Sequence, residues 1–234
     1  MPMSTILITG CSSGFGLQTA KLFLARGWEV IATMRTPTEG LLPASERLRV
    51  LALDITDPAS VARVVAAAGP IDVLVNNAGF GAPSPVELTA PEPVHALFQT
   101  NAVGTLAMVQ AVVPQMRQRR AGVVINVTST VTLKPLPIVG IYRASKAAVN
   151  AFTESLAVEM APFGVRAHIV LPGRSPETRG GLCPDAAAVH PQRAGGRRPG
   201  HPCVRCGASG LAGSDRSRRS ATYSCRGRCR ALDE

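Results

Sequence analysis

The chain has 234 residues, 46% of them hydrophobic, which is enough to bury the core of one domain, alone or with an appended segment. Its formal net charge of +10 lies mostly at one end, because residues 1–173 hold 13 basic and 10 acidic side chains and residues 174–234 hold 12 arginines and 5 acids. No apolar run approaches the roughly 18 residues that span a bilayer, and no basic and apolar leader precedes the first predicted strand, so we expect a cytoplasmic protein without a membrane partner.

Short apolar runs alternate with helical patterns along the first 173 residues. Strands are predicted at residues 5–9, 28–33, 48–53, 71–75, 122–128 and 165–170. Helices are predicted to end at Gly27, to run from 58 to 68, from about 92 to 117, and from about 140 to 160. This alternation indicates parallel βαβ units. The sequence therefore predicts an α/β fold, in which a six-stranded, doubly wound, Rossmann-like parallel sheet carries helices on both faces.

A glycine-rich turn links the first predicted strand to the first helix. It reads Gly10-Cys-Ser-Ser-Gly14-Phe-Gly16. Glycines let the backbone approach a pyrophosphate, and the free amides at the start of a helix face it. The glycine spacing differs from the commoner G-x-G-x-x-G, and by itself the run also fits a tight turn that holds nothing. With a strand before it and a helix after it, the turn favours nucleotide binding.

The residues after the second and third strands bear on which dinucleotide binds. About 20 residues past the glycines, an acidic side chain would bind the adenosine ribose, whereas an arginine would accept a 2′-phosphate. The chain has Arg35 there and no acid from Ala32 to Pro37, which favours NADP over NAD. A solvated loop arginine is the alternative interpretation. Asp54, just past the third strand, is placed to bind an adenine amino group.

Amide side chains follow the fourth strand and lie within the next helix. The sequence Asn76-Asn-Ala-Gly79 suits a turn. Opposite the glycine turn, it would also support the cofactor and brace the central strands. Asn101 lies inside a predicted helix, where asparagine is a mediocre helix former. A buried amide bonded to the backbone explains Asn101 equally well.

Three side chains near the last predicted helix could exchange a proton with a substrate. Tyr142 and Lys146 are four residues apart, so on a helix they share one face. A nearby ammonium stabilises a phenolate, and we expect Lys146 to lower the pKa of Tyr142. Ser129 ends the fifth strand, at the edge where open α/β sheets bind ligands. Taken alone, Tyr-x-x-x-Lys also fits an ordinary helix face.

Together these motifs resemble the single-domain branch of the short-chain dehydrogenase/reductase family. The resemblance covers residues 1–173 and rests on the ordered set Thr9-Gly-x-x-x-Gly14-x-Gly16, Asp54, Asn76-Asn-Ala-Gly79, Asn101, Ser129, Tyr142-x-x-x-Lys146 and Pro172-Gly173. It implies a Rossmann fold and hydride transfer between a nicotinamide cofactor and an alcohol or carbonyl substrate. The run from Gly14 to Gly16 and the loop from Phe80 further resemble members that act on lipophilic alcohols.

The resemblance also implies roles for individual residues. Tyr142 is the implied acid and base, Ser129 polarises the substrate oxygen, and Lys146 assists Tyr142 and holds the nicotinamide ribose. Asn101 is implied to hold a water that relays the proton. The implied cofactor contacts are Gly10, Ser12, Ser13, Gly14, Phe15, Gly16, Arg35, Asp54, Ile55, Asn77, Ala78, Gly79, Tyr142, Lys146, Pro172 and Gly173, and no metal is expected. Family members form homodimers or tetramers through two long helices and a final strand.

Residues 174–234 depart from the family pattern. The family would continue with a helical lid, another helix and a seventh strand, but this segment has few large apolar residues and is rich in Arg, Gly, Pro, Ser, Ala and Cys. We expect it to be largely disordered, which puts both the final-strand interface and closure over the substrate in doubt. Because it contains no Lys, Asn, Ile, Phe or Met, we interpret it as a GC-rich gene read in a shifted frame.

Two alternative functions follow from this segment. Without a lid, the body could bind cofactor without turnover, since water is not excluded from the substrate. Alternatively the segment binds zinc or nucleic acid, because Cys203-x-x-Cys206 and Cys225-x-x-x-Cys229 approach a four-cysteine spacing. The missing core and the single aromatic residue, Tyr223, argue against the second alternative, so no specific nucleic-acid partner is expected.

Overall fold

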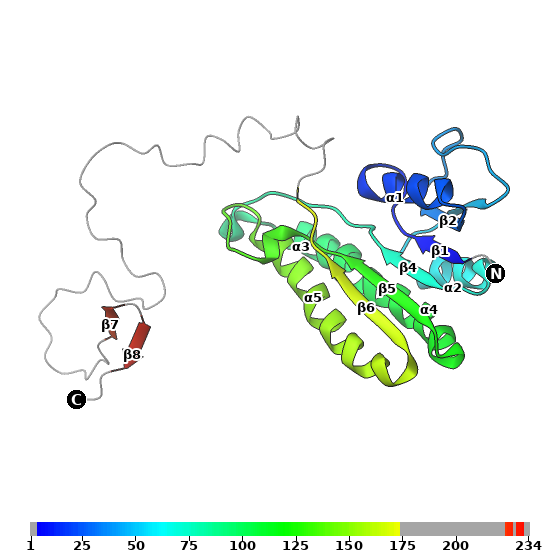
Figure 1. Ribbon diagram of the computed structural model, residues 1–234. Helices are drawn as coiled ribbons and strands as arrows, with labels where there is room; N and C mark the ends of the chain where they lie inside the picture. Colours follow the sequence, from blue (N-terminus) through cyan, green and yellow to red (C-terminus); the bar gives the residue numbers. More distant parts are fainter. Residues whose placement is uncertain (1–3, 174–222, 227, 232–234) are drawn as a thin grey trace, which may run out of the picture. The chain divides into compact units, whose positions relative to one another are not determined.

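The computed structural model describes residues 4–173, 223–226 and 228–231 (Figure 1). Six strands form one sheet in the order β3-β2-β1-β4-β5-β6, and every pairing in it is parallel. The strands are β1 (Thr5–Ile8), β2 (Glu29–Met34), β3 (Leu48–Ala52), β4 (Val73–Asn76), β5 (Gly122–Val127) and β6 (Val165–Val170). The direction of winding reverses between β1 and β4, which confirms the predicted doubly wound, Rossmann-like sheet.

Helices connect the strands at the predicted places. They are α1 (Gly14–Ala25), α2 (Pro58–Ala68), α3 (Pro91–Phe98), α4 (Thr105–Arg119) and α5 (Gly140–Met160), with short turns η1 (Val86–Leu88), η3 (Thr130–Thr132) and η4 (Ala161–Phe163). The start of α2 follows from its sequence, because the Asp57 side chain accepts a hydrogen bond from the Ala59 amide at 2.9 Å and Pro58 needs no amide partner.

The predicted continuous helix from about 92 to 117 is wrong in one respect. A π-helix, η2 (Gln99–Gly104), separates α3 from α4. Asn101 and Gly104 are both poor α-helix formers, which lowers the cost of this interruption. Gly104 also needs to lack a side chain, because a Cβ there would lie 2.8 Å from Cγ1 of Ile55. Single π turns inside helices are common at functional sites, and this one contains Asn101.

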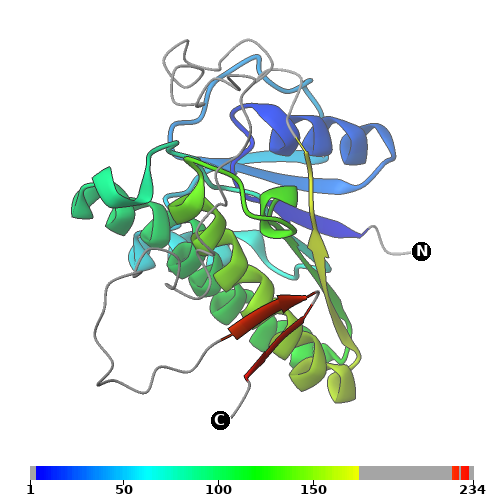
Figure 2. The ribbon, with the colours of Figure 1, turned by 90° about the vertical axis from the view of Figure 1, so that its left-hand side faces the viewer.

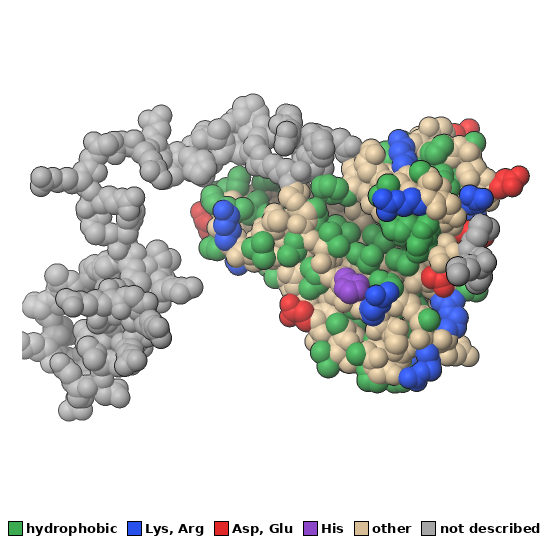
Figure 3. Space-filling model, in the orientation of Figure 1, with side chains coloured by type: hydrophobic (Ala, Val, Ile, Leu, Met, Phe, Trp, Pro, Cys, Tyr) green, Lys and Arg blue, Asp and Glu red, His purple; other side chains and the backbone are tan. Residues whose placement is uncertain are grey.

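The two faces of the sheet are covered unequally by the described residues. On one face α2, α4 and α5 pack on residues such as Leu7, Ile31, Leu74 and Val124, all fully buried. On the other face α1 packs on β1 and β2 through Ala20, and it lies across the sheet from α4 and α5 (Figure 2). Hydrophobic side chains gather in a patch next to α1 on this second face (Figure 3). Partly buried residues of β5 belong to this second core, namely Val123, Ile125 and Val127.

A chain of buried polar side chains joins two central strands to α5. Asn76 at the end of β4 donates to the Asn126 Oδ1 in β5 at 2.9 Å, and Asn126 donates to the Thr153 hydroxyl in α5 at 2.7 Å. Thr153 in turn donates to the backbone carbonyl of Val149. Each of the three polar residues is at most 3% exposed. These bonds fix α5 against the sheet below the turn that carries Tyr142 and Lys146.

The stretch Pro91–Arg119 is long and apolar enough to cross a membrane by length and composition, contrary to the expectation that no segment would be. In the fold, however, 44% of its most apolar window is buried. Met108, Val112 and Met116 are fully buried in the core against the sheet. The described structure therefore uses this stretch as a core helix.

A separate small unit is described beyond Gly173. It is an antiparallel hairpin of β7 (Tyr223–Arg226) and β8 (Arg228–Ala231), with Cys225 opposite Cys229. The sequence did not predict this hairpin. The predicted disorder and shifted reading frame of residues 174–234, and the zinc interpretation of Cys203-x-x-Cys206 with Cys225-x-x-x-Cys229, fall mostly on residues 174–222, which lie outside the described residues.

Candidate active site

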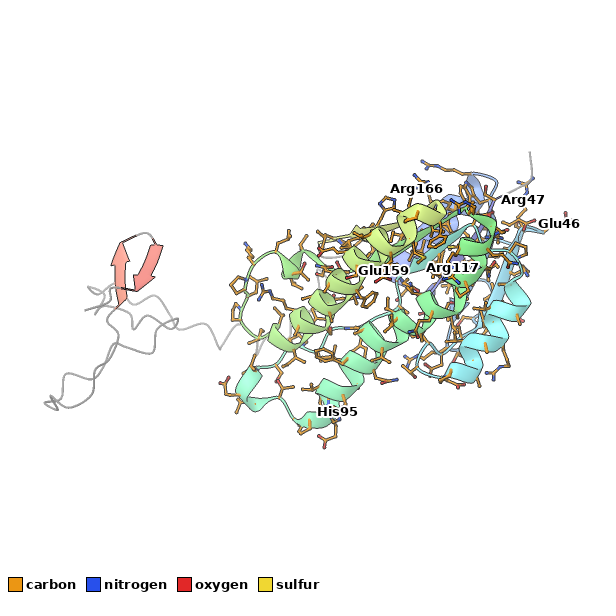
Figure 4. The ribbon with its side chains drawn as sticks, turned by 90° about the horizontal axis from the view of Figure 1, so that it is seen from below. Glu46, Arg47, His95, Arg117, Glu159 and Arg166 are labelled. Atoms are coloured by element: carbon orange, nitrogen blue, oxygen red, sulfur yellow. The ribbon has the colours of Figure 1, made fainter. Side chains whose placement is uncertain are left out.

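The carboxyl ends of the central strands meet at one edge of the sheet, and the predicted site residues gather there. The helices α4 and α5 begin at this edge and run side by side away from it, toward Arg117 and Glu159 (Figure 4). His95 on α3 lies at the opposite end of this pair of helices from Arg117 (Figure 4). We call this edge the site edge.

The glycine turn after β1 is held by the segment after β4. The Thr9 hydroxyl accepts hydrogen bonds from the amides of Asn77 and Ala78, each at 3.0 Å. The Asn77 side chain donates back to the carbonyls of Thr9 and Gly10, again at 3.0 Å. A Cβ on Gly16 would lie 2.3 Å from the Gly10 oxygen, so only glycine fits this close approach. Asn77 and Ala78 thus brace the turn as predicted.

The start of α1 has the properties of a phosphate site. The helix begins at Gly14, no side chain caps it, and its first turn contains no acidic residue. The first amides of a helix lack acceptors within it and carry the positive end of its dipole. Ser12, Ser13 and Phe15 are exposed beside these amides. The turn therefore fits the pyrophosphate of a dinucleotide.

Cys11 carries a side chain of this turn that faces away from solvent. Its thiol is fully buried and donates to the Ile8 carbonyl at 3.3 Å. Burial raises the pKa of the thiol to about 12, although a backbone hydrogen bond with Thr33 lowers it somewhat. Cys11 is therefore a packing residue and offers no thiolate to a ligand.

The residues predicted to hold the adenosine half lie after β2 and β3. Hydrogen bonds from the Thr56 hydroxyl and amide, at 2.7 and 2.9 Å, lower the pKa of Asp54, with a smaller contribution from Arg35. Arg35 is exposed and near enough to Asp54 for this electrostatic effect. Ile55 is buried against Gly104. Arg35 and Asp54 thus lie together, with an ionised carboxylate and a permanent cation.

Ser129 and Tyr142 meet beyond β5. Ser129 is 9% exposed, and its hydroxyl accepts a bond from the Val131 amide at 3.3 Å. Burial raises the pKa of Tyr142, and the hydrogen bond with the Ser129 side chain opposes this rise. The phenol is therefore protonated at neutral pH.

Lys146 does not lower the pKa of Tyr142, so that prediction is wrong. The lysine is only 4% exposed, and its Nζ donates to the Val127 carbonyl at 3.0 Å. Burial lowers its own pKa to about 8. Because both groups lose water on folding, the charged form of each is disfavoured, and neither residue contributes to the pKa shift of the other.

The side chain of Asn101 is fully committed to the protein. Its Oδ1 accepts from the Phe80 amide at 3.0 Å, and its Nδ2 donates to the Phe80 carbonyl at 2.8 Å and to the Ser145 hydroxyl at 3.1 Å. The residue is 0% exposed. Of the two interpretations of Asn101, the buried amide bonded to backbone is the one the structure shows. Its implied role in holding a water stays a prediction.

One short loop lies next to Asn101, Lys146 and Tyr142. A Cβ on Gly79 would lie 2.9 Å from Oδ1 of Asn101 and 3.1 Å from Nζ of Lys146. A Cβ on Gly81 would lie 3.7 Å from the Tyr142 ring. The same loop begins with Asn77 and Ala78, which hold the glycine turn. Residues 77–81 therefore join the nucleotide half of the site edge to the half with Tyr142 and Lys146.

Pro172 and Gly173 complete the edge after β6. The Pro172 carbonyl accepts from the Thr130 amide at 3.1 Å, which places it beside Ser129. Gly173 is exposed, and a Cβ there would meet no atom within 4 Å. Of these two predicted cofactor contacts, only Pro172 is tied to the rest of the site.

Two residues of this network were absent from the predicted site. Thr9 holds the segment from Asn77, and Ser145 links Asn101 to the carbonyl of Tyr142 at 2.8 Å. Ser145 had a readable signal, because three residues after Tyr142 on a helix it lies on the same face. Thr9 also had a readable signal, since it lies between β1 and the glycine turn. Among the described residues, no three His, Cys, Asp or Glu side chains form a metal-binding group.

Comparison with known proteins agrees with this architecture. The family model described as short chain dehydrogenase matches residues 4–179. The chain belongs to the short-chain dehydrogenase family. A short-chain dehydrogenase from Streptomyces avermitilis, whose crystal structure is solved, superposes with a TM-score of 0.71 at 35% identity, covering 74% of this chain and 66% of that one. A second solved structure, ElxO with NADP bound, gives a TM-score of 0.71 at 28% identity, covering 76% of this chain and 77% of that one.

Curated members of the short-chain dehydrogenase family are also similar in sequence. A 3-ketodihydrosphingosine reductase of Bacteroides thetaiotaomicron is 39% identical over 177 residues, which is 74% of this chain and 64% of the relative. The human 17-beta-hydroxysteroid dehydrogenase type 1 is 39% identical over 184 residues, or 73% and 56%. This chain thus spans less than two thirds of the length of these short-chain dehydrogenases.

Proposed function

We propose that this chain is an oxidoreductase that uses NADP to interconvert an alcohol and a carbonyl compound. The observation that carries the proposal is the loop of residues 77–81. Its first residues hold the glycine turn at the start of α1, and its last residues lie against Tyr142, Lys146 and Asn101. A dinucleotide with its phosphates at the turn would reach the tyrosine along this loop.

The roles of the reacting groups follow from their environment. Bound NADP or NADPH would accept or supply the hydride. Tyr142, held protonated by burial, would donate a proton to the substrate oxygen in reduction and accept it in oxidation. Ser129 lies against Tyr142 and would orient that oxygen by a hydrogen bond. Lys146 lies under the loop at Gly79 and would hold the ribose next to the nicotinamide.

The preference for NADP rests on Arg35. It is exposed just past β2, and no acidic side chain lies between Ala32 and Pro37 to repel a 2′-phosphate. A structure similar in fold, ElxO, holds NADP, which supports the same choice. Asp54, the carboxylate whose pKa Arg35 helps to lower, accepts two hydrogen bonds from Thr56, and no ion pair among the described residues includes Arg35.

The substrate we propose is lipophilic. Large apolar side chains stay exposed on two loops beside Tyr142, namely Phe80, Val86, Leu88, Leu133 and Leu136. The loops touch, because the Ser84 amide donates to the Ile138 carbonyl at 2.7 Å and Val86 packs close to Gly140. Ile138 has a φ of 57°, a left-handed conformation that strains a β-branched residue and is typical of functional sites. The similar reductase and dehydrogenase named for sphingoid and steroid compounds support this class.

The test is NADPH oxidation by the full chain against aldehydes and ketones of increasing chain length. We expect kcat/KM to rise by up to about fourfold per methylene, as each added group leaves water for the apolar loops. Tyr142→Phe should bind NADPH normally and lose about 10²–10⁴-fold in kcat. Retained turnover in this variant would refute the role of Tyr142. Binding of NADPH without turnover on any carbonyl would instead favour a cofactor-binding protein.

The same assay with Arg35→Asp tests the cofactor. The variant should reverse the preference, because a carboxylate repels the 2′-phosphate and binds the free ribose hydroxyls of NAD. Lys134→Asp, which makes the same charge change on an exposed lysine of another loop, is the matched control. An unchanged ratio of NADP to NAD affinity in Arg35→Asp would remove the argument for NADP.

A further inference from the structure

Ser145 lies at the centre of a buried link between the loop of residues 77–81 and the catalytic helix. It is 0% exposed and sits between Tyr142 and Lys146 on α5. Its hydroxyl donates to the Tyr142 carbonyl at 2.8 Å and accepts from Nδ2 of Asn101 at 3.1 Å. One atom thus joins the turn of α5 that carries the phenol to the π-helix that carries Asn101.

Asn101 carries the link onward to Phe80. An asparagine amide has two donor hydrogens, and here one goes to the Phe80 carbonyl and the other to Ser145. The Oδ1 accepts the Phe80 amide. The Asn101 side chain therefore binds both the amide and the carbonyl of Phe80. Its second amide hydrogen has only the Ser145 hydroxyl as acceptor.

Removing the Ser145 hydroxyl would leave that hydrogen without an acceptor in a fully buried place. An unsatisfied buried donor is costly, so the amide of Asn101 would turn or shift to find another partner. Any such movement alters its two bonds to Phe80. The effect would reach the loop that contacts Lys146 at Gly79 and Tyr142 at Gly81.

We propose that Ser145 is a positioning residue that sets the place of Phe80 and its loop relative to Tyr142 through Asn101. The inference rests on the proposed function for its catalytic consequence. The hydroxyl touches neither substrate nor cofactor in this arrangement. The hydroxyl would set the distance between Tyr142 and the loop of residues 77–81, which would border both the substrate and the cofactor.

The test compares Ser145→Ala with Ser155→Ala in the full chain. Ser155 is the matched control, because it lies on the same helix and donates to the Ala151 carbonyl but is exposed. Amide hydrogen exchange is the readout, since the Phe80 amide donates to Asn101 and needs no turnover to be measured. We expect exchange at Phe80 to become about tenfold faster in Ser145→Ala and to stay unchanged in Ser155→Ala.

The Ser84 amide distinguishes a local effect from general loosening. Ser84 lies three residues beyond the loop of residues 77–81, and its amide donates to the Ile138 carbonyl, away from Asn101. Exchange at Ser84 should stay within twofold of the original protein. Equal acceleration at Ser84 and Phe80, or no acceleration at Phe80, would overturn the proposal. If Ser145→Ala does not fold, Ser145→Cys, which fills the site with a slightly larger side chain and a weaker acceptor, gives the same comparison.

A double variant tests whether the effect passes through Asn101. Asn101→Ala removes the Phe80 bonds directly, so adding Ser145→Ala should change Phe80 exchange no further. Additive effects would overturn the route through Asn101. In turnover, Ser145→Ala should lower kcat about tenfold while the Kd of NADPH stays within twofold. Absence of turnover in the original protein would contradict the proposed function only. The hydrogen exchange at Phe80 tests the role of Ser145 without turnover.

Discussion

The polar groups at the amino ends of the six strands have different partners from those at the carboxyl ends, which form the site edge. At the edge where the strands begin, Asp72 accepts from the Thr5 amide and lies 3.9 Å from Arg119, and Arg49 donates to the carbonyls of Ala67 and Ala68 that end α2. Charges there are partly exposed and neutralise one another or a helix end. The charged side chains at that edge are therefore bound to other groups of the protein.

At the site edge the polar groups are mainly hydroxyls and amides. Thr9, Asn77, Asn101 and Ser145 hydrogen-bond to one another and to backbone, and the cation Lys146 is buried with only a carbonyl as its partner. Among the ion pairs of the described residues, none includes Lys146. The difference teaches that the site edge keeps positive charge and helix amides available, as an anionic cofactor requires.

The largest expected effect comes from the buried lysine. Its pKa is about 8 in the folded protein and 10.5 in the unfolded chain, so between these values the unfolded chain binds the extra proton. The contribution of Lys146 to stability must therefore rise with pH across this window, by about 3 kcal/mol in all, and stay flat at its lower level below pH 8.

The measurement is the free energy of unfolding by denaturant from pH 7 to 10.5, in the original protein and in Lys146→Met. The rise due to the lysine is the difference between the two curves. Cys11 and Tyr142, whose pKa values are raised, act in the opposite direction and cancel in this difference. Lys134→Met, an exposed lysine, is the control. Parallel curves for Lys146→Met and the original protein would contradict the burial of an uncompensated cation.

A smaller effect is expected from the glycine turn. In Gly16→Ala the new Cβ would overlap the Gly10 oxygen and, at 2.4 Å, Nδ2 of Asn77, so the brace between the turn and the loop must shift. We expect a loss of about 2 kcal/mol in stability and weaker NADPH binding. Gly40→Ala is the control, because its positive φ of 73° carries strain but nothing lies within 4 Å. Normal NADPH affinity in Gly16→Ala would show that the close contact is not required.

The smallest effect is expected at the opposite edge. Asp72→Asn keeps an acceptor for the Thr5 amide and removes only the charge facing Arg119, 3.9 Å away on partly exposed side chains. Such pairs contribute less than about 1 kcal/mol. Thermal unfolding of Asp72→Asn should match the original protein closely, and NADPH affinity should not change. A large loss of cofactor affinity would mean that the two edges are not independent.

The strands and their order could be predicted because buried parallel strands leave apolar runs that are readable locally. The glycine turn, Ser129, Tyr142 and Lys146 follow each other at spacings that fix their place on a strand end or helix face. The π-helix could not be predicted, because the poor helix formers Asn101 and Gly104 lower the cost of an interruption without fixing its type, and the bond from Asn101 to Phe80 joins residues 21 positions apart.

The direction in which the pKa of Tyr142 shifts could not be predicted from the sequence either. Spacing shows that Lys146 lies one turn away, but desolvation depends on how much of each side chain the fold covers. The roles of Thr9 and Ser145 depend likewise on partners that only the folded chain brings close. Residues 174–222 lie outside the described structure, so the expectations for them stay predictions.

The position of β1 in the middle of the sheet has a consequence for biosynthesis. The strand that leads into the glycine turn pairs with β4, whose paired residues emerge from the ribosome 67 positions later. Until Asn77 has been made, Thr9 and Gly10 lack the partners that shape the turn. The nascent chain should therefore complete its first motif late and acquire affinity for a dinucleotide only when the fourth strand docks.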